Sequence, residues 1–348
     1  MKRLAVIVCI ATLALSTVPF LSAFDETHLE KLNLGVEPWN MWRKTIRDQF
    51  IDLSQATLTN MNFWRIELSL ANLTAADLSG SSIRYSSIMR ARLPDANLRE
   101  CNFEGTTFAQ SDMRRVQLGL AQLNNVRLYR CDLLQADFSG ARVENADIKE
   151  ADLQFATLSN TSFAGSDFNR AKLTGCTANN TSFENAKLQY IQANFVHFTN
   201  VNLRYADLSY TEFGGSVFGE CDLRYAKVFS ADLHQTRFIK SKLTDANFSR
   251  SQASYVVIND CDLSGSNFEQ SNLSHANLRD SNLSRVNFSR CNLRFADLEG
   301  VTIRDTIFNE ADISGARIDW HWRGFFTQQR VRGLPTVRWI TNAHSSPK

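Results

Sequence analysis

The sequence has no excess of charge of either sign. Its 348 residues include 38 Lys and Arg against 36 Asp and Glu, a formal net charge of only +2. A nucleic-acid-binding surface needs a clustered excess of basic side chains, and a protein that mimics nucleic acid needs a large acidic excess. The composition therefore argues against both classes. Because 43% of the residues are hydrophobic, it also argues against a disordered chain.

Motifs that mark catalytic and metal sites are missing as well. The sequence contains no G-x-S-x-G, no Gly-rich phosphate loop, and no C-x-x-C or H-x-x-x-H spacing for a metal. An active site needs several titratable side chains that converge on one point. The six histidines are instead scattered along the chain, at His28, His197, His234, His275, His321 and His344. We therefore expect a protein that is not an enzyme and that holds no metal or cofactor.

The one long apolar run stands at the start of the chain. Lys2 and Arg3 precede an apolar stretch over residues 4–15, and Ala23 supplies a small residue for cleavage. This arrangement is typical of a secretory signal peptide over residues 1–23, and the run is shorter than the roughly 20 residues of a membrane span. We expect export to the periplasm or an equivalent compartment, with no integral membrane segment after cleavage. An uncleaved N-terminal anchor is the alternative.

A five-residue repeat fills most of the chain. From residue 53 to residue 318, every fifth position is Leu, Phe, Ile, Val or Met, except at Ala178, Ala193 and Ala253. These 54 pentads follow one another without an insertion or deletion. A small or slim residue usually stands two positions before each large one. A tandem repeat of this length sets the architecture of the whole chain.

A period of five matches neither the 3.6 residues of a helix nor the 2.0 of a strand. It fits a solenoid in which each pentad forms one side of a coil, with two side chains inside and three outside. Phenylalanines recur at intervals of twenty residues, which is four pentads. Each coil is therefore expected to have four sides, with like side chains stacked in core columns, one of which contains Phe248, Phe268, Phe288 and Phe308.

Several pentads share the pattern A-(D/N)-L-x-x, as in Ala76-Asp77-Leu78, Ala96-Asn97-Leu98 and Ala296-Asp297-Leu298. In this pattern the chain resembles the pentapeptide-repeat family over about three quarters of its length. The resemblance implies an all-β solenoid, a right-handed quadrilateral β-helix, over residues 51–318. The 54 pentads then make 13.5 coils, about 13 complete ones. At a strand spacing of about 4.8 Å the rod would be roughly 65 Å long.

Both ends of such a solenoid need caps, because the end coils expose apolar side chains and unpaired backbone. Residues 24–50 are expected to form an α-helical N-terminal cap. There, Thr27 and Glu30 form a capping-box pattern that opens one helix, and Pro38 is expected to open a second. Residues 319–348 are expected to form a C-terminal cap and a basic tail, because large aromatic residues follow the last pentad, at Trp320, Trp322, Phe325 and Phe326.

Six of the seven cysteines occupy the small inward position of a pentad: Cys101, Cys131, Cys176, Cys221, Cys261 and Cys291. No two of them are twenty residues apart, so no two are neighbours in a column. A disulfide requires Cα atoms within about 7 Å of each other. We therefore expect free thiols that serve as small apolar filler.

One group of outward-facing residues near the middle of the repeat combines tyrosine with arginine. On a twenty-residue coil Tyr190 stacks with Tyr210, and Tyr205 stacks with Tyr225. Arg204 and Arg224 lie beside the second stack. Tyrosine and arginine are enriched in binding hot spots, so these six residues form a candidate protein-binding patch. The alternative is that the aromatic ladders only stabilise the sides of the rod.

These observations favour an exported, non-enzymatic scaffold, a rigid rod that binds a protein partner of unidentified type through its flat sides. The first alternative is a nucleic-acid mimic that binds a topoisomerase, which the resemblance implies because some members of the family have this activity. The balanced charge and the signal peptide speak against it. Binding of an envelope polysaccharide by exposed tyrosines is the second alternative. End-to-end pairing of two rods into a homodimer is left open.

Overall fold

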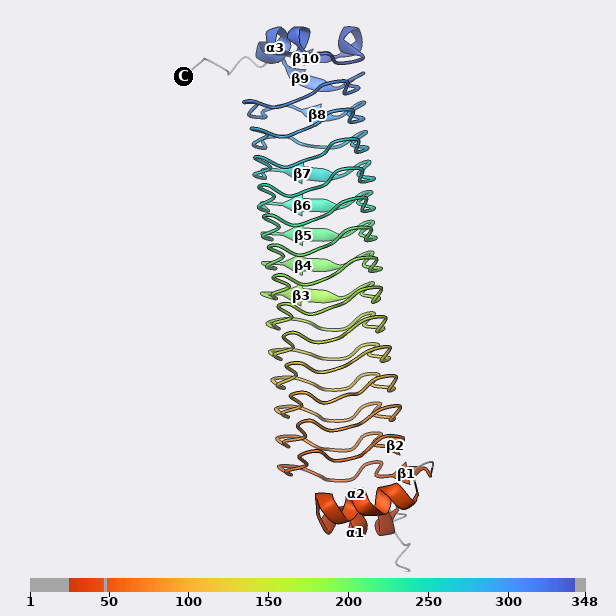
Figure 1. Ribbon diagram of the computed structural model, residues 1–348. Coiled ribbons are helices and arrows are strands. Elements are labelled where there is room, and N and C mark those ends of the chain that lie inside the picture. Colours follow the sequence, from red (N-terminus) through yellow and green to blue (C-terminus); the bar gives the residue numbers. More distant parts are fainter. Residues whose placement is uncertain (1–24, 47–48, 342–348) are drawn as a thin grey trace, which may run out of the picture.

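The fold is a parallel β-solenoid of about 14 turns with short helices at both ends (Figure 1). It is seen in a computed structural model that describes residues 25–46 and 49–341. The predicted signal peptide over residues 1–23 lies outside the described residues. The four-sided coil of twenty residues is confirmed by the pairing register, since Thr177 pairs with His197 and His197 with Val217.

The strands are short and pair in parallel with the strand of the next coil. A two-stranded sheet joins β1 to β2, a five-stranded sheet runs from β3 to β7, and a three-stranded sheet has the order β10-β9-β8. Their bounds are Ile51–Asp52 (β1), Ala71–Asn72 (β2), Thr177–Asn179 (β3), His197–Thr199 (β4), Val217–Gly219 (β5), Arg237–Ile239 (β6), Val257–Asn259 (β7), Asp297–Leu298 (β8), Arg317–Asp319 (β9) and Arg338–Ile340 (β10). Elsewhere single parallel bridges such as Asp132 to Asp152 join the coils.

Each corner of the coil is made by a residue in the left-handed conformation. Every fifth residue from Gln55 to Gly315 has a positive φ, between 49° and 75°. This conformation costs an L-residue about 1 kcal/mol or more, because its Cβ crowds the following carbonyl. The corner is held by the neighbouring coil, since the Gln55 N–H donates to the Thr74 carbonyl at 2.8 Å and the same bond recurs along the rod.

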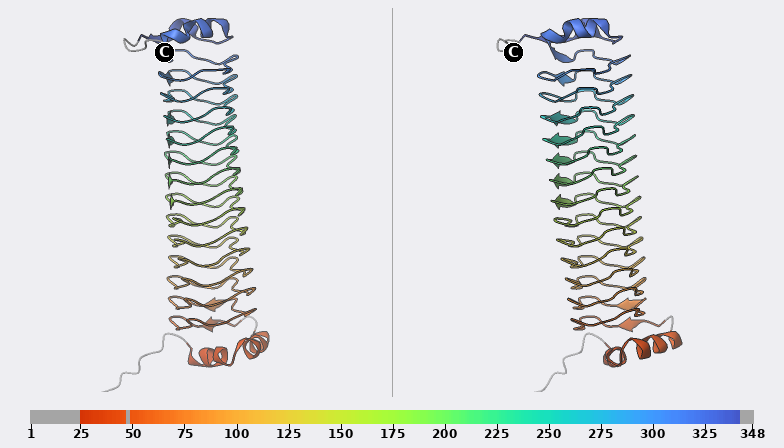
Figure 2. Two further views of the ribbon diagram at one scale, coloured as in Figure 1. Left: turned by 90° about the vertical axis from the view of Figure 1, so that its left-hand side faces the viewer. Right: turned by 60° about the vertical axis from the view of Figure 1, so that its left-hand side comes forward.

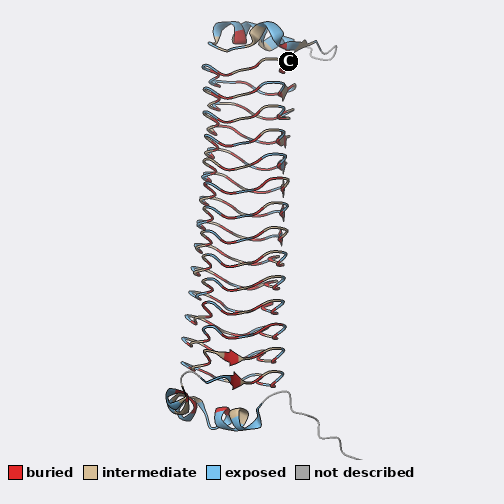
Figure 3. Ribbon diagram, turned by 90° about the vertical axis from the view of Figure 1, so that its right-hand side faces the viewer, coloured by how far each residue is buried: buried red, intermediate tan, exposed pale blue. Residues whose placement is uncertain are grey.

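The large inward residues fill the centre of the rod, so buried and exposed positions alternate along every coil (Figure 3). The predicted column of Phe248, Phe268, Phe288 and Phe308 is confirmed. All four side chains are buried, and successive rings stack at centroid distances of 4.7, 5.6 and 5.2 Å. One pair departs from the expected stacking, because the rings of Phe198 and Phe218 meet edge-on at 85°.

Two helices close the N-terminal end, α1 (Glu26–Asn33) and α2 (Val36–Thr45) (Figure 2). The predicted start of the first helix at Thr27 was wrong. Asp25 is the N-cap, and its carboxylate accepts hydrogen bonds from both the backbone N–H and the hydroxyl of Thr27. The second helix starts before Pro38, at Val36. Proline is tolerated there because the first N–H groups of a helix have no intrahelical partner.

Side chains of α2 form hydrogen bonds with backbone groups of the first coil, which has no preceding coil to pair with. The Trp39 indole N–H donates to the Glu67 carbonyl at 2.7 Å, and Arg43 donates through Nη2 to the Ser69 carbonyl at 2.7 Å. The Asn40 amide pairs with the same edge in both directions, since its Nδ2 donates to the Arg65 carbonyl and its Oδ1 accepts from the Glu67 N–H. The open backbone groups of Arg65, Glu67 and Ser69 are thereby satisfied.

At the C-terminal end, η1 (Trp320–Trp322), α3 (Arg323–Gln328) and η2 (Leu334–Thr336) follow the last coil. The Phe326 side chain is buried, and its ring lies 4.8 Å from that of Phe308, the last member of the phenylalanine column. β10 then pairs with β9 at an offset of 21 residues rather than 20, since Arg338 lies opposite Arg317. The cap therefore covers the apolar core, but its strand no longer follows the twenty-residue spacing of the coils.

The phenylalanine column makes a testable contribution to stability. We expect Phe268→Ala to lower the free energy of unfolding by about 3–5 kcal/mol, since it leaves a cavity between two stacked rings, and Phe268→Leu to lower it by less than about 1.5 kcal/mol. Urea denaturation followed by circular dichroism measures both values. A loss below about 1 kcal/mol for the alanine variant would mean that the rings do not pack as described.

Candidate functional site

The two predicted tyrosine stacks are present on the surface. The rings of Tyr190 and Tyr210 are parallel within 3° at a centroid distance of 4.9 Å, and those of Tyr205 and Tyr225 within 6° at 5.1 Å. All four side chains are 45–52% exposed. Each tyrosine is the left-handed corner residue of its pentad, so the stacks run along two neighbouring corners of the rod. The stacking geometry is confirmed, and the binding role stays a prediction.

The two arginines of the patch differ in their partners. Arg224 is paired within its own coil, because its Nε donates to the Asp222 carboxylate at 2.8 Å. Burial acts to raise the pKa of Asp222, but hydrogen bonds from Arg224 outweigh it and hold the pKa below its usual value. The Arg204 guanidinium instead lies over the Tyr205 ring at 5.5 Å, and its buried Nε has no hydrogen-bond partner within the described part of the chain. Among the described residues, Arg204 is therefore the arginine of the patch whose charge is not paired with an acid.

The side of the rod between the two tyrosine corners is polar. Asp207 lies on it between Lys187 and Lys227, and its carboxylate accepts a hydrogen bond from the Gln189 amide at 2.9 Å. Beyond it, the Phe229 ring meets Tyr210 edge-on at a centroid distance of 5.4 Å. The patch thus combines aromatic corners with a strip that carries one acidic and two basic side chains.

A third aromatic corner was missed by the sequence reasoning. The rings of Tyr255, His275 and Phe295 stack at 4.7 and 5.0 Å, and Phe155 and Phe195 lie on the same corner without a stacked neighbour among the described residues. Where an aromatic ring on this corner lies over the next coil, the residue twenty positions later in the sequence is a glycine. A Cβ at Gly175 would lie 2.6 Å from the Phe155 ring. That aromatic-to-glycine spacing is the sequence signal that would have located this corner.

The six repeat cysteines are free and buried, as predicted. Their thiols take the place of the serine and threonine hydroxyls found at the same pentad position. The Cys131 thiol donates to the Phe108 carbonyl at 3.1 Å, as the Thr161 hydroxyl donates to the Phe138 carbonyl at 2.7 Å. Burial raises the pKa of Cys131 and of Cys176 to about 12. These thiols are therefore structural and chemically inert.

Among residues 25–46 and 49–341, no group of three or more His, Cys, Asp or Glu side chains is arranged to hold a metal ion. The closest approach of a histidine to an acid in the repeat is a single pair, with Nδ1 of His234 2.7 Å from the Asp232 carboxylate. Within the same described ranges, no helix has both the length and the apolar character to cross a membrane.

Two family models match the chain. The model for pentapeptide repeats (8 copies) matches residues 51–84, 91–128, 117–154 and 151–189, and the model for the pentapeptide repeat region matches residues 191–268 and 256–319. The matches cover well over half of the chain, so it belongs to the pentapeptide-repeat family. It is accordingly a pentapeptide-repeat scaffold protein.

Solved structures of family members show partial likeness. HetL, involved in heterocyst differentiation regulation in the cyanobacterium Nostoc sp. strain PCC 7120, is 26% identical over 79% of this chain and 94% of its own, with a TM-score of 0.19. QnrB1, a plasmid-mediated fluoroquinolone resistance protein, is 18% identical over 67% and 87%, with a TM-score of 0.19. A protein of the Arabidopsis thaliana thylakoid lumen is 26% identical over 37% and 68%, with a TM-score of 0.14. The comparison with curated proteins found no match.

The burial of the cysteines predicts their reactivity. We expect iodoacetamide at pH 8 to leave all six repeat cysteines of the folded protein unmodified, because each thiol is buried and its pKa is raised. After unfolding in guanidinium chloride all six should react. Peptide mapping by mass spectrometry scores each site, and rapid native labelling of Cys131 or Cys176 would contradict the packing of the small inward positions.

Proposed function

We propose that this protein is an exported, non-enzymatic scaffold that binds another protein through the sides and corners of its rod. The contact residues that we propose are the tyrosines at positions 190, 205, 210 and 225 together with Arg204 and Arg224. The partner is a protein of unidentified type.

The observation that carries this proposal is the pair of half-exposed tyrosine stacks. Each ring is held by its stacked neighbour and by a corner of fixed backbone, so binding costs little side-chain entropy. Tyrosine offers a partner both apolar area and a hydroxyl, and the Arg204 guanidinium adds a positive charge beside the stack, where it lies 5.5 Å from the Tyr205 ring centroid. These are the features of a protein-binding hot spot.

The alternative of a nucleic-acid mimic rests on membership of the pentapeptide-repeat family, some members of which bind a topoisomerase. A mimic would present rows of unpaired acidic groups. Here many acidic side chains are paired with an arginine of a neighbouring coil, as Asp95 is with Arg115 and Glu150 with Arg130. The charge of these rows is thereby neutralised, which disfavours this alternative.

The alternative of polysaccharide binding meets a geometric obstacle. Sugars stack on the faces of aromatic rings. In each tyrosine pair the two inward faces cover one another, since the rings are nearly parallel at about 5 Å. Only the outer faces and the edges of the rings remain for a ligand. A protein surface that packs against ring edges and hydroxyls fits the patch better than a glycan does.

Export is supported by the sequence of residues 1–23 alone, and it has its own test. Mass spectrometry of separated cell fractions gives the N-terminus of the native protein. We expect a soluble exported form that begins near Phe24. A full-length cytoplasmic form would contradict export and restore the mimic as the leading alternative.

The binding patch is tested by the double variant Tyr205→Ser/Tyr225→Ser. We expect capture of the partner to fall at least about tenfold, because hot-spot tyrosines each contribute about 2 kcal/mol or more, while the melting temperature stays within a few degrees. Cross-linked pull-down from the native compartment, quantified by mass spectrometry, measures the capture.

Tyr255→Ser is the matched control, because Tyr255 is also an exposed, stacked corner residue but lies on a different corner. It should retain capture. Equal capture by the double variant and by the unaltered protein would remove the tyrosine patch from consideration.

A further inference from the structure

A polar groove runs along the rod beside the N-terminal cap. It consists of two hollows of about 490 and 540 Å³ that share Arg65, Glu67 and Ser87 in their lining. The first hollow lies between two rows of residues from four successive coils. One row consists of outward residues on a side of the rod, Glu67, Ser87, Thr107 and Arg127, and the other of corner residues, Arg65, Tyr85, Gly105 and Asn125.

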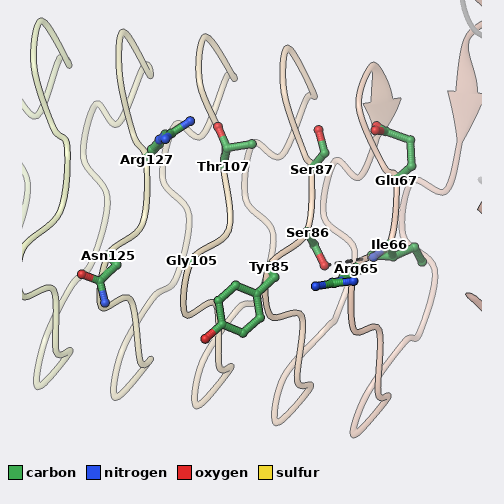
Figure 4. A pocket seen from close by; sticks show the side chains of 10 residues that line it. All are labelled: Arg65, Ile66, Glu67, Tyr85, Ser86, Ser87, Gly105, Thr107, Asn125 and Arg127. Carbon is green, nitrogen blue, oxygen red and sulfur yellow. Dashed lines mark hydrogen bonds between the residues drawn. The ribbon is translucent and has the colours of Figure 1, made fainter.

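The hollow exists because small residues interrupt both rows. Ser87 and Thr107 are short, and Gly105 has no side chain at all. A larger residue at Gly105 would displace the Tyr85 ring, since an added Cβ would lie 2.6 Å from it. The floor is therefore formed by hydroxyl groups and backbone, with Tyr85 as one wall and charged side chains at both ends (Figure 4).

The groove carries an excess of positive charge. Lys44, Arg65 and Arg127 are exposed, and none of them forms an ion pair with any residue that the structure describes; the Arg65 guanidinium lies over the Trp64 ring at 4.3 Å. Most arginines elsewhere on the rod are paired with an acid, as Arg84 is with Glu104. The one acidic residue in the lining is Glu67, whose carboxylate already accepts a hydrogen bond from the Ser69 N–H at 2.8 Å.

A buried arginine lines the second hollow. Arg43 is only 4% exposed, and one nitrogen, Nη2, donates to the Ser69 carbonyl. Its Nε and Nη1 are buried without a hydrogen-bond partner in the described ranges. Burial lowers the pKa of Arg43, and the Glu67 charge opposes that effect. A buried cation with unsatisfied donors is costly, so an anion at the mouth of this hollow would be stabilised.

We propose that this groove binds an extended acidic peptide segment of a partner protein, with carboxylates at Lys44 and Arg65 at one end and at Arg127 at the other. Between these ends the peptide backbone lies along the hydroxyls of Ser87 and Thr107. The proposal is independent of the tyrosine patch, because Tyr205 lies four coils beyond Asn125 on the same corner.

The length and chemistry of the groove favour a peptide over a nucleic acid. The corners at Arg65 and Asn125 are three coils apart, about 14 Å, which spans about four extended residues. Serine and threonine hydroxyls and the Asn125 amide both donate and accept, as a peptide backbone requires. A nucleic-acid site needs a longer row of cations, because its affinity comes from neutralising many phosphates.

The test uses the purified protein and tetraglutamate labelled with fluorescein, with equally labelled tetraglutamine as the neutral probe. Fluorescence anisotropy at low salt should show binding of tetraglutamate that weakens as salt is added. The charge-reversal variant Arg65→Glu/Arg127→Glu should bind tetraglutamate about tenfold or more weakly. Arg285→Glu is the matched control, because Arg285 occupies the same corner column and the same left-handed conformation as Arg65, and it should leave binding unchanged.

Three results would overturn the proposal. The first is equal binding of tetraglutamate and tetraglutamine, and the second is unchanged binding by the charge-reversal variant. The third is tighter binding of a tetrathymidylate or of a sulfated tetrasaccharide at the same residues, which would assign the groove to another anionic polymer. If the charge-reversal variant fails to fold, Arg65→Gln/Arg127→Gln serves in its place, with about a threefold or larger loss expected.

Discussion

The left-handed corner at every fifth residue is the constraint on which the rest of this molecule depends. From Gln55 to Gly315 the chain repeats a conformation that most residues avoid, and parallel hydrogen bonds to the adjacent coil help to hold it, together with bonds across each turn. A corner is therefore stable only when its neighbours are in register. This explains why the pentads run without insertion, and why side chains of α2 take over the pairing where the coils begin.

That constraint also organises the surface. Residues twenty positions apart lie one above another at about the spacing of paired strands. The outward-facing side chains of neighbouring coils are therefore arranged in columns along the rod. Stacked tyrosines, cross-coil ion pairs and an aromatic ring over a glycine are three uses of one column geometry. Such surfaces are rigid before a partner arrives, so binding would cost little conformational entropy.

Much of this could be predicted from the sequence, because the period of five fixes which side chains point inward and which residues share a column. The phenylalanine column, the free cysteines and the tyrosine stacks follow from counting in twenties. The start of α1 did not, since Asp25 and Thr27 are both good N-caps and sequence alone does not rank them. Nor did the groove, because its hollow depends on Ser87, Thr107 and Gly105 from separate coils and on a helix whose docking no repeat describes.

The central claim is that register in units of twenty residues holds the rod together, and a deletion series tests it most directly. Removal of residues 241–280 takes out two whole coils. This variant should fold, retain its cooperative melting, and be shorter by about 10 Å in small-angle X-ray scattering. Removal of residues 241–278 instead shifts every later apolar side chain out of its column and should abolish folding of the C-terminal part. Equal stability of the two variants would contradict the account.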